Sequence, residues 1–245
     1  MNRKLEVGPT ISEAFSIYGA QAGVLLPIAF WLFLAVAIVN ALVGNGSLLL
    51  LPLVLAVGTI AGTLYQGVVV NLVRDVRGGQ RGSSAGDLVS AAMPMVLPLI
   101  GAGLLSGIAI GVGFVLLFVP GLILVTIWAV IAPVIVVEHS GVMDSFGRSR
   151  ELVRGNGWPV LGAIVSAGVI VLVASIVFGA IASGVANGVL VRIVFSAIAA
   201  TLTAPVSALV ASVIYFRLKE IEGAAPVTAA DPLAPPAPPP APPAV

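Results

Sequence analysis

The sequence contains no cysteine and a single histidine, His139, among its 245 residues. The lack of thiols excludes disulfides and thiolate metal sites. His139 and its neighbour Glu138 fall short of the three protein ligands that a catalytic zinc ion needs. P-loop and HExxH motifs and a nucleophile–base pair are also missing from the sequence. These absences predict a non-enzymatic chain that carries no cofactor.

Charge is scarce as well, at 9% of residues, whereas soluble domains carry about 25%. Hydrophobic residues make up 59% of the chain, and the mean hydropathy is +1.17. The sequence therefore predicts an all-α polytopic integral membrane bundle with cytoplasmic interfacial amphipathic helices. The six predicted transmembrane helices cover approximately residues 24–43, 48–73, 93–119, 121–137, 159–183 and 189–216.

The basic residues predict how the chain is oriented in the membrane. Ten of the eleven fall before the first span, after the last, or in the loops after spans two and four; the exception is Arg192. The alternate connections, near residues 44–47, Pro120 and 184–188, contain none. The positive-inside rule then predicts a multi-pass protein of the plasma membrane with both termini in the cytoplasm. Arginine outnumbers lysine, which we take as an indication of a GC-rich bacterial source.

The longest polar interval within the predicted membrane domain, Glu138–Trp158, separates spans four and five. Read as a helix it is amphipathic, with an apolar stripe that consists of Val142, Phe146, Ser149 and Val153. We expect this helix to lie in the headgroup plane with its apolar side toward the bilayer. The alternative is a solvated helix that only connects two spans.

Three arginines on this helix, Arg148, Arg150 and Arg154, are the candidate contacts for lipid headgroups. Anionic lipid attracts a basic residue near the surface by about 1 kcal/mol. We expect Asp144 and Glu151 to pair with Arg148, because they lie four and three residues away. Arg150 and Arg154 would then be freer to bind phosphate. The alternative is that all three serve only as orientation signals.

Similar segments precede the other outward-going spans. Thr10 with Glu13 and Ser84 with Asp87 both have the spacing of a capping box, in which a hydroxyl and a carboxylate satisfy free N–H groups at a helix start. We therefore propose three repeats of one unit: interfacial helix, span out, short turn, span back. The alternative is that any junction between a loop and a span looks like this.

Span three carries Gly103, Gly107 and Gly111 at four-residue spacing, a pattern that lets helix backbones approach closely. We expect these glycines to pack within the chain rather than in a dimer. The membrane domain is predicted to cover residues 1–222. Residues 223–245, which contain half of the 18 prolines, are predicted to form a disordered, proline-rich cytoplasmic tail.

The central stretch carries a resemblance to a known family. The run VPGLIL from Val119, the acid Glu138, the segment from Asp144 to Gly155 and Trp158 together resemble bacterial six-span proteins of the glycerophosphoryl diester phosphodiesterase membrane domain family. The resemblance covers approximately residues 5–222. It implies a six-span helical fold. In fused relatives a separate soluble domain carries the catalytic residues, and this sequence holds no such segment, so the resemblance implies no enzymatic activity here.

Two functions remain open from the sequence. The first is a non-catalytic integral membrane protein, a scaffold or a lipid-associated accessory protein, whose partners are membrane lipids and an unidentified membrane protein. The second is a transporter or channel for a lipid or a small apolar solute. The lack of acidic residues within the spans weighs against an ion- or proton-coupled carrier. Nothing in the sequence indicates nucleic-acid binding.

Overall fold

The computed structural model describes residues 4–43, 50–79, 84–185 and 188–224, and all regular secondary structure in these ranges is helical. The helices are α1 (Val7–Val43), α2 (Leu51–Arg77), α3 (Ala85–Ala92), a 3₁₀ turn (Met93–Met95), α4 (Val96–Leu116), α5 (Phe118–Ile127), α6 (Ile131–Glu138), α7 (Val142–Val153), α8 (Gly157–Val185) and α9 (Val189–Ala224). Six of the helical segments are long and apolar enough to cross a membrane. The predicted all-α fold is confirmed, and the chain is a multi-pass membrane protein.

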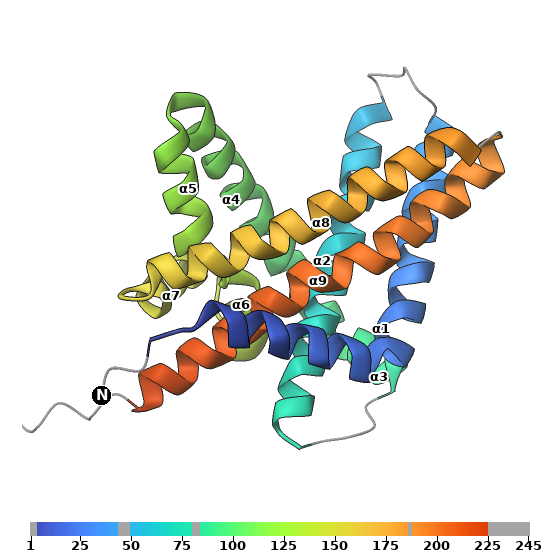
Figure 1. Ribbon diagram of the computed structural model, residues 1–245. Coiled ribbons are helices and arrows are strands. Elements are labelled where there is room, and N and C mark those ends of the chain that lie inside the picture. Colours follow the sequence, from blue (N-terminus) through green and yellow to red (C-terminus); the bar gives the residue numbers. More distant parts are fainter. Residues whose placement is uncertain (1–3, 44–49, 80–83, 186–187, 225–245) are drawn as a thin grey trace, which may run out of the picture.

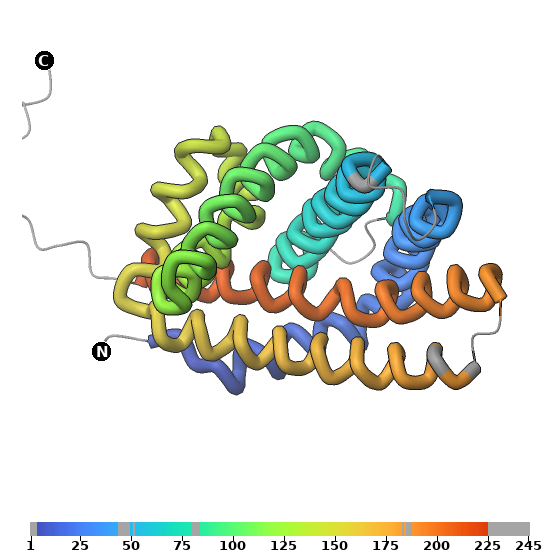
Figure 2. The backbone as a smooth tube through the Cα atoms, turned by 90° about the horizontal axis from the view of Figure 1, so that it is seen from above, coloured from blue at the N-terminus to red at the C-terminus, as the bar shows by residue number. Residues whose placement is uncertain are grey.

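The long helices form three hairpins: α1 with α2, α4 with α5 and α6, and α8 with α9 (Figure 1). The start of α1 and the end of α9 lie at the same end of the bundle, which we call the basal end. The end of α1 with the start of α2, the junction of α4 with α5, and the end of α8 with the start of α9 lie away from it, at what we call the distal end. The first half of α1 packs along the second half of α9. Seen from above, the α8–α9 hairpin runs across one side of the other two (Figure 2).

The hydrophobic core lies toward the basal end. The second half of α2, the start of α6 and the second half of α9 supply most of its fully buried side chains, among them Val68, Val134 and Leu209. Large apolar side chains near the hairpin turns are exposed instead, for example Leu116 at 71% and Leu190 at 77%. An apolar surface of this kind suits hydrocarbon, so these side chains near the distal end face lipid.

The fourth span differs from the single helix predicted for residues 121–137. It consists of α5 and α6, which are separated by a break at residues 128–130. Pro133 accounts for the break, because it has no N–H to donate to the carbonyl of Ala129 and its ring clashes with that group. The turn predicted near Pro120 lies at Leu117, whose backbone is extended. Pro120 is in the first turn of α5, where its missing N–H costs nothing.

The predicted interfacial helix before the first span is continuous with that span. α1 begins at Val7, so Thr10 lies inside the helix, where its hydroxyl donates to the carbonyl of Glu6 at 2.6 Å. The capping box expected from Thr10 and Glu13 is therefore wrong. The box at Ser84 and Asp87 is confirmed, since both of its hydrogen bonds are present at the start of α3. α1 contains Pro27 and changes direction along its length (Figure 1).

The glycine that packs closely against a neighbouring helix is Gly121, and not the predicted glycines of the third span. A Cβ placed on Gly103, Gly107 or Gly111 would meet nothing within 4 Å, so these residues do not pack against a neighbouring helix of the described chain, and the prediction of internal packing is wrong. A Cβ on Gly121 would instead lie 2.5 Å from the ring of Phe114. The missing side chain at Gly121 is what lets α4 and α5 meet closely.

The predicted tail falls outside the described residues, apart from its first two positions. Gly223 and Ala224 belong to α9, which therefore extends two residues past the predicted domain boundary at 222.

Candidate functional site

The amphipathic helix α7 packs against protein with its predicted apolar stripe. Ser149 and Val153 are buried, and the ring of Phe146 lies 4.9 Å from that of Trp128 in an edge-to-face arrangement. Ser149 donates a hydrogen bond of 2.8 Å to the carbonyl of Ile127 at the end of α5. That carbonyl is left without a helical partner by the break before α6. The stripe is therefore confirmed, but it faces the α5–α6 break and not the bilayer.

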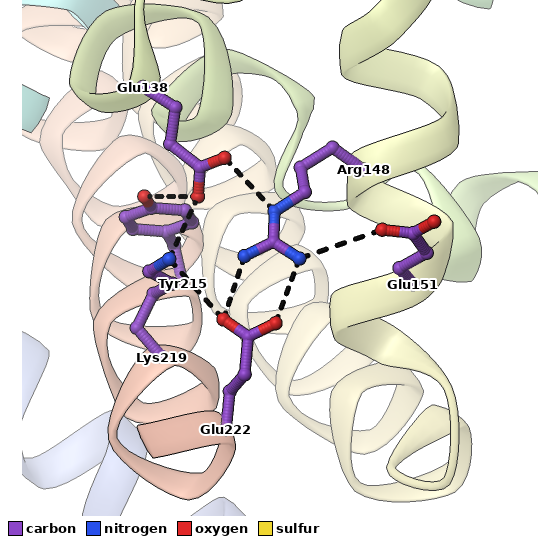
Figure 3. A network of polar contacts seen from close by, with 6 residues as sticks. All are labelled: Glu138, Arg148, Glu151, Tyr215, Lys219 and Glu222. Atoms are coloured by element: carbon purple, nitrogen blue, oxygen red, sulfur yellow. Dashed lines mark hydrogen bonds and ion pairs between the residues drawn. The ribbon is translucent and has the colours of Figure 1, made fainter. Parts of the chain in front are cut away.

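Arg148, on the same helix, is the centre of a network of charged side chains (Figure 3). Its guanidinium donates two hydrogen bonds to the Glu222 carboxylate, at 2.7 and 2.8 Å, and one to Glu138, at 3.0 Å. It also lies 3.6 Å from Glu151. The predicted partner Glu151 is present, although its contact is the longest, while Asp144 makes no ion pair with any described residue. The network joins α7 to the ends of α6 and α9.

Two further side chains of α9 complete this network. The Tyr215 hydroxyl donates to Glu138 at 2.9 Å, and the Lys219 ammonium lies 3.2 Å from Glu138 and 3.3 Å from Glu222. The hydrogen bonds to Glu222, and after them those to Glu138, hold the pKa of Arg148 above its ordinary value against the effect of burial. Arg148 therefore stays protonated at every physiological pH.

This arrangement suits a structural clamp. Its carboxylates are engaged by cations, and these contacts join three helices. Within the described ranges no group of three or more His, Asp or Glu side chains could hold a metal ion.

A second cluster lies on another side of α9. Glu13 of α1 pairs with both Arg77 of α2 and Arg217 of α9, and Arg77 also pairs with Glu220. The guanidinium of Arg77 lies over the Phe216 ring, 5.5 Å from its centroid. The first cluster thus ties α9 to α6 and α7, and this second one ties it to α1 and α2. The last turns of α9 therefore hold parts of all three hairpins together at the basal end.

Sequence reasoning missed most of these residues, although α9 carried a signal. Arg217 with Glu220, and Lys219 with Glu222, are opposite charges three residues apart, which places two separate pairs on different sides of one helix. The positive-inside rule treats the basic members only as orientation signals. Their partners Glu13 and Glu138 are far away in the sequence, and only folding shows the match.

Of the three predicted headgroup contacts, Arg150 and Arg154 differ from Arg148. Both are exposed, and neither guanidinium has an ion pair within the described part of the chain. Arg148 is half-buried and surrounded by carboxylates. Arg150 and Arg154 therefore have guanidinium groups that are available to bind phosphate, whereas the guanidinium of Arg148 is bonded to carboxylates of the protein. Headgroup binding itself stays a prediction.

A groove of about 760 Å³ opens between α5 and the start of α8, and its lining includes Gly155, the neighbour of Arg154 in the sequence. Its lining is mainly apolar and includes Leu122, Ile123 and Leu161 along its length. Lys4, Gly155 and Trp158 also line it, and the Trp158 side chain is 84% exposed. Gly155 has a positive φ of 87°, which glycine adopts without strain, and this turn directs the chain from α7 into α8. Lys4 makes no ion pair with any described residue.

Comparison of the chain with protein-family models, with characterised proteins and with solved structures finds no match.

Proposed function

We propose that this chain is a non-catalytic integral membrane protein of the plasma membrane, a lipid-associated accessory or scaffold protein with both termini in the cytoplasm. The α5–α8 groove carries this proposal. This groove is mainly apolar and runs along the side of the bundle, and its lining includes the basic residue Lys4 and Trp158. We infer that an acyl chain of an anionic phospholipid lies in this groove.

The dimensions and the chemistry of the groove support a phospholipid. From Val119 to Ile127 the α5 wall rises about 12 Å, at 1.5 Å per residue, which suits a large part of one acyl chain. Lys4 supplies a cation, and Arg154 adjoins the lining residue Gly155. Tryptophan is enriched at the level of the headgroups, and the exposed Trp158 fits that level.

Arg150 and Arg154 are the proposed phosphate contacts. A guanidinium binds a phosphate through two parallel N–H groups, and a lysine ammonium does not reproduce this planar geometry. Arg148 contributes indirectly in this proposal, by holding α7 in place through Glu138 and Glu222. We also propose that the chain is related to the glycerophosphoryl diester phosphodiesterase membrane domain family. This relationship would extend to the six-span fold and would not include a catalytic activity.

Native mass spectrometry of the full chain, extracted from vesicles of phosphatidylglycerol and phosphatidylethanolamine, tests the proposal. Ile123→Trp fills the groove and should reduce the retained phosphatidylglycerol severalfold. Ile108→Trp, at an exposed position of α4 outside the groove, is the matched control and should change nothing. The double variant Arg150→Lys with Arg154→Lys keeps the charge but should also lower retention. If Ile123→Trp and the arginine double variant both retained as much phosphatidylglycerol as the unchanged protein, the proposal would be wrong.

A further inference from the structure

Arg192 stands apart from the other basic residues of the chain. It lies in the first turn of α9, at the distal end of the bundle, whereas the remaining basic residues that the structure describes lie toward the basal end. Its side chain is exposed, and its guanidinium has no ion pair or hydrogen bond to any described residue. A charge at a membrane boundary without a protein partner is costly unless water or an anion satisfies it.

Two cavities meet at this arginine. One, of about 700 Å³, lies between α8 and α9, and the other, of about 390 Å³, lies between α9 and the end of α1. Arg192 and Ser196 line both of them. The guanidinium therefore stands at the junction of two hollows and not on a flat surface.

The lining of these cavities suits a ligand with an anionic head and an apolar body. It contains no carboxylate. Its hydroxyl protons are already used within their own helices, since Ser175 donates to Val171, Ser196 to Ile193 and Thr203 to Ala199. Arg192 and Asn40 are the two lining side chains that carry N–H donors. An anion would therefore bind at one end of the α8–α9 cavity.

The rest of that cavity is apolar or small. Gly179, Ala182, Ala199 and Ala200 leave space between the two helices, and the rings of Phe178 and Phe195 meet edge to face with centroids 6.1 Å apart. Along α9 the lining extends from Arg192 to Thr203, which is about 16 Å at 1.5 Å per residue. One leaflet contributes half of a hydrocarbon core of about 30 Å, so the cavity matches the depth of a single leaflet.

We propose that Arg192 and the α8–α9 cavity form a binding site for one glycerophospholipid of the leaflet opposite both termini. The guanidinium binds the phosphodiester through paired N–H groups, and Asn40 offers a further donor from α1. An acyl chain lies between α8 and α9 past Phe178 and Phe195. This site is separate from the α5–α8 groove and lies in the other leaflet.

The test counts the lipids retained by the full chain, extracted from vesicles of equal parts phosphatidylglycerol and phosphatidylethanolamine, by native mass spectrometry. Arg192→Gln removes the cation, and Ala199→Trp fills the cavity. Each should lower the occupancy of one tightly held lipid about tenfold, which is the loss expected for a contact of about 1.4 kcal/mol. The double variant should lose no more than this one lipid, because both changes act on the same molecule. Val194→Trp, at an exposed position of α9 that lines neither cavity, is the matched control.

Three outcomes distinguish one lipid site from a solvated arginine and from two separate lipids. Unchanged retention in Arg192→Gln would overturn the proposal and leave Arg192 as a side chain that only reaches toward water. Loss of two lipids in the double variant would also overturn it, since arginine and cavity would then serve different molecules. Arg192→Gln combined with Ile123→Trp should lose two lipids, so that the α5–α8 groove and this site can fail independently. The thermal midpoint of each variant in detergent checks that it is folded.

Discussion

Arg148 and Glu222 are joined by two parallel hydrogen bonds, at 2.7 and 2.8 Å, although 74 residues separate them in the sequence. The pair couples the middle of α7 to the last turns of α9. A forked arginine–carboxylate pair has stricter geometry than a single contact, so it defines how the two helices meet. Since Glu138 accepts from the same guanidinium, one side chain orients three helices.

Replacing Arg148 by Gln should lower the stability of the folded protein by about 1–3 kcal/mol. The change leaves Glu138 and Glu222 without their main cation in a half-buried setting, where an unpaired charge is costly. Arg150→Gln removes an exposed arginine of the same helix and should cost less than about 0.5 kcal/mol. Denaturant unfolding in detergent compares the two. Equal losses would mean that the network contributes nothing specific.

Glu13 and Arg217 should show a measurable coupling energy. Their side chains lie 2.7 Å apart between α1 and α9, and residues in direct contact are not additive. A double-mutant cycle with Glu13→Gln and Arg217→Gln should give about 1 kcal/mol, reduced by the partial exposure of both groups. The same cycle with Arg150→Gln in place of Arg217→Gln is the control and should give a value near zero. A coupling of zero for both cycles would contradict the ion pair.

Gly121→Ala should destabilise the α4–α5 hairpin by about 1–3 kcal/mol, because the added methyl group would overlap the Phe114 ring. Gly107→Ala adds the same group on α4, where nothing lies within 4 Å. That control should be neutral or stabilising, since alanine favours a helix over glycine by up to about 1 kcal/mol. Thermal unfolding in detergent measures both. A stable Gly121→Ala protein would show that the hairpin tolerates wider spacing.

Reporter fusions at Asn45, Arg81, Asn187 and the C-terminus should read outside, inside, outside and inside. The reason is the one-sided distribution of basic residues, which keeps their loops in the cytoplasm. Enzymatic reporters that are active on only one side of the membrane make the measurement. A cytoplasmic reading at Asn187 would contradict the last hairpin.

Deletion of residues 225–245 should leave the thermal midpoint unchanged, because a composition dominated by proline and alanine cannot build a core. Ending the chain after Ile221 is the informative comparison. That truncation also removes Glu222 and should lower the midpoint by several degrees, as the loss of its pairs with Arg148 and Lys219 requires. Equal midpoints for the two truncations would contradict a stabilising role of Glu222.

Local signals determined the membrane class, the all-α fold and the number of spans. An apolar run of twenty residues has few structures open to it in hydrocarbon, because every backbone N–H and C=O group must be paired within the segment. The capping box at Ser84 and Asp87 is likewise local, since its partners are three residues apart. Amphipathicity correctly identified the apolar side of α7, but the expectation that this side faces the bilayer was wrong, since it packs against protein.

The tertiary structure alone decided which charges meet. The sequence predicts pairing of Arg148 within its own helix, and the contact with Glu151 is present at 3.6 Å. The shorter bonds of Arg148 go to Glu138 and Glu222, because the basal ends of α6, α7 and α9 converge there. The contact at Gly121 also depends on how two helices pack, and the spacing of glycines does not specify it. Periodicity reports which side of a helix is apolar. It carries no information on the partner that this side meets, since that depends on the relative placement of segments far apart in the chain.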